Sequence, residues 1–287
     1  MSNSPLATPS ATLAVLKRFG LATKKSLGQH FLVDDNVVAR ILELAAIEPG
    51  SVVLEVGPGI GTLTAALCEH AGAVVAVERD GDLLKALAST TAACERLAVL
   101  RADAVAISPK QLAEPFGAPV ALVANLPYGV AATVVLRFFE KLPAMRSATV
   151  MVQSEVADRM AASPGGKEYG SYTVKLRLLA RPAGRFAVPR SCFLPPPRVD
   201  SAVLRLDRRP LSDDHALLAD AARVADAAFA QRRKTVRNSL RSTLGVDVAA
   251  LDEALAAAAI DGSLRAEVLE PGRFLALAEA LRGQLAE

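Results

Sequence analysis

Several residue types that define particular classes of protein are scarce or absent in this sequence. Its 287 residues include no tryptophan, 4% aromatic residues and 3 cysteines. The cysteines, at positions 68, 94 and 192, are far apart and form no CxxC pair. This argues against a disulfide framework and against a zinc site, so no metal is expected. No apolar run approaches the roughly 20 residues that a membrane helix needs, which argues against a membrane protein.

The beginning of the chain lacks the basic and apolar regions that together make a secretory signal. Together with the few unpaired cysteines, this favours a reducing compartment, and we expect a cytoplasmic protein. Hydrophobic residues make up 52% and charged residues 22% of the chain, enough to bury a core. At roughly 150 residues per domain, the length predicts two domains. The net charge of +3 identifies no partner by itself, and we expect a monomer.

After residue 50, short apolar runs alternate with helical segments. Nearly continuous Val, Ile, Leu and Ala runs of this kind are typical of parallel strands covered on both faces. The expected fold class is therefore α/β, with a doubly wound, mostly parallel sheet. The predicted strands are 52–56, 74–77, 97–100, 120–124 and 148–152, with a last strand at 201–206, and the predicted helices are 62–70, 82–91, 131–141 and 155–162.

The two ends of the chain follow other patterns. Residues 1–9 are rich in Ser, Pro and Thr and are expected to fray, before a short helix over 10–19 that ends at Gly20. Residues 174–178 alternate in polarity, which suits a strand, although a helix is possible. From residue 208 the pattern is that of Ala- and Leu-rich helices. These patterns predict an N-terminal segment over 1–23, an α/β domain over 24–208 and a small all-helical domain over 209–287.

A glycine-rich loop with Gly57, Gly59 and Gly61 follows the first predicted strand and precedes a helix. Glycines here let the backbone approach a ligand beside a positive helix terminus, although G-x-G-x-G differs from the dinucleotide pattern G-x-G-x-x-G. Glu78 lies about 20 residues further on, where ribose hydroxyls are bound in such sheets. Asp103 is placed to accept a hydrogen bond from an adenine amine. A nicotinamide dinucleotide and S-adenosylmethionine both fit this pattern.

The tetrapeptide Asn125-Leu126-Pro127-Tyr128 follows the strand predicted at 120–124. The amide oxygen of Asn125 and the main-chain oxygen of Leu126 or Pro127 can accept hydrogen bonds from a ring amine, while Tyr128 can stack on the ring. Such a tetrapeptide also suits a simple turn. Its position at the same sheet edge as the glycine loop favours a binding site for a planar base with an amino group.

Five motifs, in this order, resemble those of the ribosomal RNA adenine N6,N6-dimethyltransferases. The resemblance covers about residues 24–240 and implies a Rossmann-like class I methyltransferase fold with S-adenosylmethionine as cofactor. It also implies a substrate: two adjacent adenines of small-subunit (16S-type) ribosomal RNA, each methylated twice, within a maturing small subunit. The motifs are Leu27-Gly-Gln-His-Phe-Leu32, Glu55-Val-Gly-Pro-Gly-Ile-Gly61, Asn125-Leu-Pro-Tyr128, Phe193-Leu-Pro-Pro-Pro-Arg-Val-Asp-Ser201 and Arg232-Arg-Lys-Thr-Val-Arg-Asn-Ser239.

The resemblance also implies roles for the matched residues. His30, where the family often has Asn, and Leu32 would lie against the methionine or ribose part of the cofactor. The loop of Gly57, Gly59 and Gly61 would pass beneath the methionine moiety, Glu78 would hold the ribose hydroxyls and Asp103 would read the cofactor's adenine. Asn125 would sit between the methyl donor and the target base, within the Asn125–Tyr128 motif that includes Leu126 and Pro127. Tyr128 would stack on the target adenine, and Phe193 would be the second face of the aromatic clamp.

A basic stretch follows in a segment predicted as one helix around residues 221–240. Arg233, Arg237 and Arg241 recur at helical spacing beside an apolar stripe of Ala225, Phe229, Val236 and Leu240. Because no acid lies four residues from Arg233 or Arg237, contact with RNA phosphates is favoured over a merely solvated basic face. The full set of predicted RNA-binding residues is Lys24, Lys25, Arg232, Arg233, Lys234, Arg237 and Arg241.

Four other functions compete with this one. The related enzymes that methylate large-subunit ribosomal RNA typically carry Ile at the position of Leu126. A DNA adenine methyltransferase would need a sequence-reading domain, and a nicotinamide oxidoreductase would need a hydride-acceptor site. A non-catalytic relative, such as a ribosome-assembly factor or a mitochondrial transcription factor, would not need the intact set of Glu78, Asp103, Asn125 and Tyr128.

Overall fold

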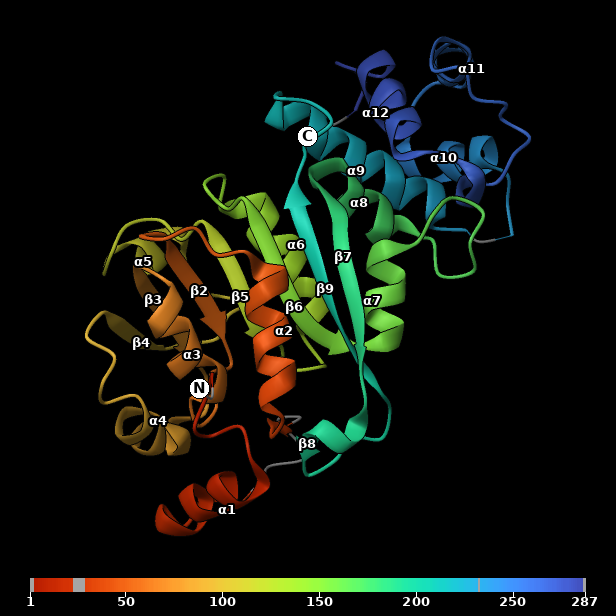
Figure 1. The fold of residues 1–287 in the computed structure, drawn as a ribbon. Helices are drawn as coiled ribbons and strands as arrows, with labels where there is room; N and C mark the ends of the chain where they lie inside the picture. The colour runs from red at the N-terminus through yellow and green to blue at the C-terminus, as the bar shows by residue number, and fades with distance from the viewer. Residues whose placement is uncertain (1–2, 23–28, 232, 286–287) are drawn as a thin grey trace. The chain divides into compact units, whose positions relative to one another are not determined.

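The computed structural model describes residues 3–22, 29–231 and 233–285 (Figure 1). The chain divides into two compact units, one of Met1–Ala157 with Pro182–Asp207 and the other of Asp158–Arg181 with Arg208–Glu287. Residues 158–181 thus belong to the second unit, although the sequence groups them with the α/β domain. Among the described residues, none of the helices has the length and apolarity required to cross a membrane.

The first unit is organised around a sheet. Over the described residues this sheet has seven strands, in the order β4-β3-β2-β5-β6-β9-β7. Neighbours from β4 to β6 are parallel and β9 is antiparallel to β6, which confirms the predicted doubly wound, mostly parallel sheet. All six residues of β3 are buried, as expected for a strand covered on both faces. The strands are β2 (Val52–Val56), β3 (Ala73–Glu78), β4 (Leu97–Arg101), β5 (Ala121–Asn125), β6 (Ser147–Gln153), β7 (Ala180–Val188) and β9 (Ser201–Arg208).

Two helices of this unit, α2 and α5, begin at side chains that cap them. Asp34 accepts hydrogen bonds from the first N–H groups of α2, and Ser108 forms a capping box with Gln111 at α5. Helix α3 follows the glycine loop directly and has the predicted bounds, as does α6. The helices are α2 (Asp35–Ala45), α3 (Thr62–His70), α4 (Leu84–Thr90) after the 3-10 turn η2 (Gly81–Leu83), α5 (Pro109–Ala113), α6 (Ala131–Lys141) and α7 (Ser154–Ala161), which continues into the second unit.

The N-terminal segment is fixed rather than frayed over the residues that the structure describes. The Asp35 carboxylate accepts hydrogen bonds from the main-chain N–H groups of Asn3 and Ser4, at 3.0 and 2.8 Å. Helix α1 (Pro9–Arg18) then buries Leu16 in a cluster with Phe31, Ile60, Leu83 and Ala86. The sequence predicts that residues 1–9 fray, and for residues 3–9 this prediction is wrong. Hydrogen bonds to the Asp35 carboxylate, at the start of α2, hold the beginning of this segment in place.

Two short strands that the sequence does not predict pair with each other. Strand β1 (Phe31–Leu32) is antiparallel to β8 (Phe193–Leu194), with Leu32 opposite Phe193. Each strand has two residues, too few for any periodicity to reveal. Between β8 and the end of β7 lies the 3-10 turn η3 (Arg190–Cys192).

The second unit is helical, which confirms the predicted C-terminal helical region. Residues 174–178, whose alternating polarity suits a strand, lie in helix α8 (Ser171–Leu179). Most of the residues in this part of the helix are buried, so apolar residues occur on several of its faces and do not show the helical period. Ser239 donates a hydrogen bond to the Ala227 carbonyl, so α10 folds back beside α9. The single helix predicted around 221–240 is therefore wrong: Thr235 caps a new helix after a break. The further helices are α9 (His215–Phe229), α10 (Val236–Leu244), α11 (Val248–Ala257), η4 (Ala266–Val268) and α12 (Pro271–Ala280).

Candidate active site

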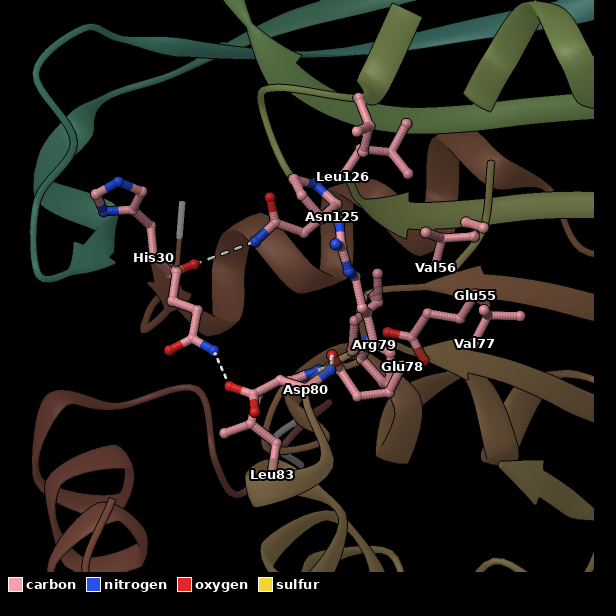
Figure 2. A pocket seen from close by; sticks show the side chains of 18 of the residues that line it. His30, Glu55, Val56, Val77, Glu78, Arg79, Asp80, Leu83, Asn125 and Leu126 are labelled. Atoms are coloured by element: carbon pink, nitrogen blue, oxygen red, sulfur yellow. Dashed lines mark hydrogen bonds between the residues drawn. The ribbon is translucent and has the colours of Figure 1, made fainter. Parts of the chain in front are cut away.

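A cavity of about 410 Å³ opens at the carboxyl ends of β2, β3 and β5 in the first unit, where ligands bind in sheets of this type. Figure 2 shows Glu78, Asp80 and Asn125 from the sheet edge and, next to Asn125, the main chain of His30 from the segment before β1. The predicted site residues that line it are His30, Leu32, Gly57, Gly59, Glu78, Asp103, Asn125, Leu126, Pro127 and Tyr128.

The glycine loop forms one wall of the cavity. Gly59 has a φ of +61°, and a Cβ there would lie 3.3 Å from the Phe31 ring, so a side chain would be strained and would crowd the cavity wall. Gly61 does not line the cavity. It caps α3, and a Cβ at that position would lie 2.9 Å from Cγ2 of Thr91, so the third glycine serves helix packing instead.

Glu78 ends strand β3 with its carboxylate already oriented. Its Oε1 accepts from the N–H of Asp80 at 2.7 Å and its Oε2 accepts from the N–H of Gly59 at 3.2 Å. Burial raises the pKa of this carboxyl, and these backbone donors oppose the rise. The backbone N–H of Arg79 is a third donor to this carboxylate, so about one of its roughly four acceptor sites stays available for the hydroxyl of a ligand.

Glu55 is a lining residue that the sequence did not single out. Its side chain is 1% exposed, and no partner for Oε2 is found among the described residues. Burial raises its pKa to about 8, with a smaller contribution from the charge of Glu78. At neutral pH the carboxyl is therefore mostly protonated and can donate a hydrogen bond. An acid inside an otherwise apolar strand run was the signal available in the sequence.

Asp103 lies at the end of β4 and is partly exposed. Its Oδ1 accepts from the N–H of Val105 at 2.9 Å, and its Oδ2 is 3.5 Å from Nη1 of Arg79. Asp80 was also missed: its Oδ2 accepts from Nε2 of Gln29 at 2.8 Å, which ties the segment before β1 to the end of β3. The position of Asp80, two residues after Glu78 at the same sheet edge, was the available signal.

Asn125 ends strand β5, and a hydrogen bond fixes the orientation of its amide. Nδ2 donates to the main-chain oxygen of His30 at 3.3 Å, as the dashed line in Figure 2 shows. Since the nitrogen is directed at a carbonyl, Oδ1 is the amide atom that can accept from a ligand. The Pro127 oxygen accepts from the N–H of Val130 at 3.1 Å, which leaves the Leu126 oxygen as the better second acceptor.

Tyr128 lies beside this amide and is held at its hydroxyl, where Oη and the Oγ of Ser201 are 2.8 Å apart. Burial raises the pKa of Tyr128, so the phenol stays protonated at neutral pH. The structure does not bring Phe193 to the cavity: it is 2% exposed, because the pairing of β8 with β1 turns its ring into the hydrophobic core.

The basic residues of the second unit do not form one face of a helix. Arg233 and Lys234 are exposed in the turn before α10, and Arg241 is exposed on α10. Arg237 is paired with Asp252 of α11 through Nε–Oδ1 and Nη2–Oδ2 contacts of 2.5 and 2.6 Å. The spacing of residues along α10 could not reveal Asp252 as the partner of Arg237, because Asp252 lies on α11. The predicted residues Lys24, Lys25 and Arg232 lie outside the described residues.

The family model described as "Ribosomal RNA adenine dimethylase" matches residues 20–282. The ribosomal RNA small subunit methyltransferase A of Rhodococcus erythropolis is 43% identical over 296 aligned positions, which cover 96% of this chain and 97% of that protein. The protein of the same name from Kineococcus radiotolerans is 46% identical over 266 positions, which cover 91% of this chain and 87% of its own length.

Solved structures give the same result for the fold. The 23S rRNA methyltransferase ErmE has a TM-score of 0.65 and 29% identity, and the match covers 88% of this chain and 99% of that chain. A dimethyladenosine transferase from Plasmodium falciparum has a TM-score of 0.74 at 22% identity, covering 88% and 97%. The second likeness concerns the fold alone, and both confirm the class I methyltransferase architecture predicted from the motifs.

Proposed function

The chain belongs to the ribosomal RNA adenine dimethylase family, and from this premise we propose that it uses S-adenosylmethionine to dimethylate the N6 amines of two adjacent adenines in small-subunit ribosomal RNA. The family membership makes it an rRNA adenine dimethyltransferase. The observation that carries the proposed assignment of residues is the meeting, in one cavity, of the oriented Asn125 amide, the Tyr128 ring and the Glu78 carboxylate.

The cavity fits the proposed cofactor in the chemistry of its walls. Glu78 offers buried acceptors for ribose hydroxyls, and Asp103 offers a partly exposed acceptor for the adenine amine. Gly57 and Gly59 would leave room for the methionine part, and Leu32 and the main chain of His30 would lie against it. When bound, S-adenosylmethionine supplies a methyl group already activated by its sulfonium.

The residues of the chain then act mainly by positioning. The lone pair of an adenine amine is delocalised into the ring, which makes the nitrogen a poor nucleophile. Hydrogen bonds from its N–H groups to Oδ1 of Asn125 and to the Leu126 oxygen favour a pyramidal nitrogen whose lone pair faces the methyl group. The surplus proton leaves to water, so no side chain is needed as a base. After the first methylation one N–H remains to hold the base.

The target base must leave its stack to reach Asn125 and Tyr128. We propose that exposed cations of the second unit hold the RNA backbone meanwhile, with Arg233, Lys234 and Arg241 as phosphate contacts. Lys24, Lys25 and Arg232 stay in this proposal on sequence grounds alone. The proposed substrate particle is a pre-ribosomal small subunit in the cytoplasm, and the proposed active form is a monomer.

The test uses purified protein, isotopically labelled S-adenosylmethionine, and small and large ribosomal subunits that lack their own adenine dimethylation. The RNA is digested to nucleosides and read by mass spectrometry, with the Asn125→Ala variant as control. We expect labelled N6,N6-dimethyladenosine from the small subunit alone and none with the variant. Label in the large subunit would instead assign the substrate of the related resistance enzymes. No label at all, with cofactor binding intact, would indicate a protein that acts by binding.

A further inference from the structure

Glu55 is a buried carboxyl in the cavity wall that takes no part in the mechanism proposed above. It lies in β2, in register with Ala76 of β3. Its side chain is 1% exposed, and its Oε2 has no hydrogen-bond partner among the described residues. A buried polar atom without a partner is costly and uncommon, so its presence in the wall of a ligand cavity points to a role toward the ligand.

The groups that face Glu55 do not supply a compensating charge. Burial raises the pKa of Glu55, and the charge of Glu78 on β3 adds to the rise. From α3, the Thr64 hydroxyl opposes the rise without forming a regular hydrogen bond, and the Cys68 thiol stays neutral because burial raises its pKa. From β5, Val123 contributes to the apolar cluster on this face of the sheet. Within the described part of the chain, no cation is among the groups that shift the pKa of Glu55, so its carboxyl is mostly neutral at pH 7.

Glu55 adjoins the places to which the proposed function assigns the two halves of the cofactor. Gly57, in the loop assigned to the methionine part, follows two residues later, within roughly 7 Å along the chain. Glu78, assigned to the ribose, is near enough for its charge to act on Glu55, and Figure 2 shows both residues at one end of the cavity. In S-adenosylmethionine the sulfonium joins these two halves. The positive charge of the cofactor therefore belongs to the part of the cavity that Glu55 lines.

We propose that Glu55 distinguishes the charged cofactor from its uncharged product by gaining and losing a proton; this inference rests on the proposed function. Entry of the sulfonium drives a proton from the Glu55 carboxyl to the solvent, because opposite charges attract in a cavity shielded from water. Methyl transfer breaks the bond between sulfur and the methyl carbon, and the electron pair stays on sulfur as a neutral thioether. The carboxylate then faces no cation and takes up a proton from the solvent. The product thus lacks an attraction that the cofactor had, which favours its replacement by fresh cofactor.

A comparison of matched ligands isolates this effect. S-adenosylmethionine and S-adenosylhomocysteine share their ammonium and carboxylate groups and differ only in the charged methyl-sulfonium. Sinefungin carries an amine-bearing carbon in place of the sulfonium and transfers no methyl group, so it reports the charge alone. Glu55→Gln keeps the shape of the side chain and fixes it as neutral. Glu69→Gln, which removes an exposed carboxylate from α3, is the matched control.

The first experiment measures the dissociation constants of the three ligands by isothermal titration between pH 5.5 and 7, where their α-amines are protonated. For the wild type and Glu69→Gln, the log affinity for the two cationic ligands should rise by roughly 0.5–1 per pH unit more than that for S-adenosylhomocysteine, because up to one proton is released. For Glu55→Gln the three slopes should agree, and at pH 7 its preference for S-adenosylmethionine over S-adenosylhomocysteine should be at least fivefold smaller than that of the wild type. Equal slopes for cationic and neutral ligands in the wild type would overturn the inference.

The second experiment counts the protons directly, by titration at pH 7 in buffers of different ionisation enthalpy. The wild type should release roughly 0.5–1 proton on binding S-adenosylmethionine or sinefungin and close to none on binding S-adenosylhomocysteine. Glu55→Gln should release close to none with any ligand, and thermal unfolding shows whether the variant is folded. The same proton count for all three ligands in the wild type would refute the role of Glu55 and leave the proposed cofactor standing. If no ligand binds at any pH, the proposed cofactor is itself refuted and the inference falls with it.

Discussion

The hydroxyl of Tyr128 is fixed by Ser201, whose Oγ lies 2.8 Å from Oη. Ser201 is the first residue of β9, is fully buried and belongs to the same unit as Tyr128. The bond holds the phenol ring at its hydroxyl edge, and not at the faces on which a base would stack. Ser201 is therefore a positioning residue that acts through Tyr128 and not on the substrate.

Removing either partner of this bond should have nearly the same effect. A hydrogen bond contributes about 0.5–1.5 kcal/mol net, so Ser201→Ala and Tyr128→Phe are each expected to lower kcat/KM for the RNA roughly two- to twelvefold. The double variant should be no worse than the poorer single variant, because both substitutions break one bond. Steady-state kinetics on small subunits checks this, with cofactor affinity expected to stay constant. Additive losses would show that the two side chains act independently.

Asn125 is expected to be indispensable for transfer and dispensable for cofactor binding. Asn125→Ala removes the Oδ1 acceptor, and we expect kcat to fall at least a hundredfold while the dissociation constant of S-adenosylmethionine changes less than threefold. Asn125→Asp is the matched variant: it keeps the shape but sets a carboxylate oxygen against the His30 carbonyl, in place of the Nδ2 donor. Single-turnover rates and isothermal titration measure the two quantities. Unchanged turnover in Asn125→Ala would remove this residue from the proposed mechanism.

Glu55 should make stability depend on pH. Its folded pKa of about 8 is far above the value of about 4.3 in an unfolded chain, so between these values the folded state holds a proton that the unfolded state has lost. The free energy of unfolding should therefore fall as pH rises from about 5 to 8, by up to about 4 kcal/mol from this group. Glu55→Gln, which keeps a neutral group at every pH, should abolish that contribution. Urea unfolding of both proteins at several pH values tests this, and parallel pH curves would contradict it.

Exposed and paired cations should differ in how they affect RNA binding. Arg233→Glu combined with Lys234→Glu is expected to weaken binding to small subunits and to lower the slope of log K against log salt concentration by roughly 1–2, because each lost phosphate contact contributes about 0.7–0.9. Arg237→Gln serves as control, since its guanidinium is already paired with Asp252. It should alter the slope by much less. If the slope of log K against log salt concentration is unchanged in the double variant, Arg233 and Lys234 do not contact RNA phosphates and this turn is an ordinary solvated surface.

The parallel part of the sheet was predictable because each strand carries its own signal. Strand β2 and helices α3 and α6 have the predicted bounds, since an unbroken apolar run, a glycine loop and a helical period are local features. The meeting of the strand-end residues around the cavity could be predicted for the same reason. The carboxyl ends of parallel strands share one edge, so Glu78 and Asn125 had to come close.

What the sequence could not reveal are contacts between distant segments. The His30 ring meets Tyr128 only because β1 pairs with β8, and those strands are too short to leave a pattern. The same pairing buries Phe193, whose motif suggested a place in the cavity. Arg237 was expected to be unpaired because only its own helix was considered, whereas Asp252 comes from the next one.

Pro195 and Ser201 lie on one continuous stretch of chain, and each holds a different ring: Pro195 holds His30, and Ser201 holds Tyr128. Both rings, and so the gap between them, are thus anchored at the two ends of the connection between β8 and β9. A protein engineer who inserts or deletes a residue in this connection would reset the gap without touching either ring.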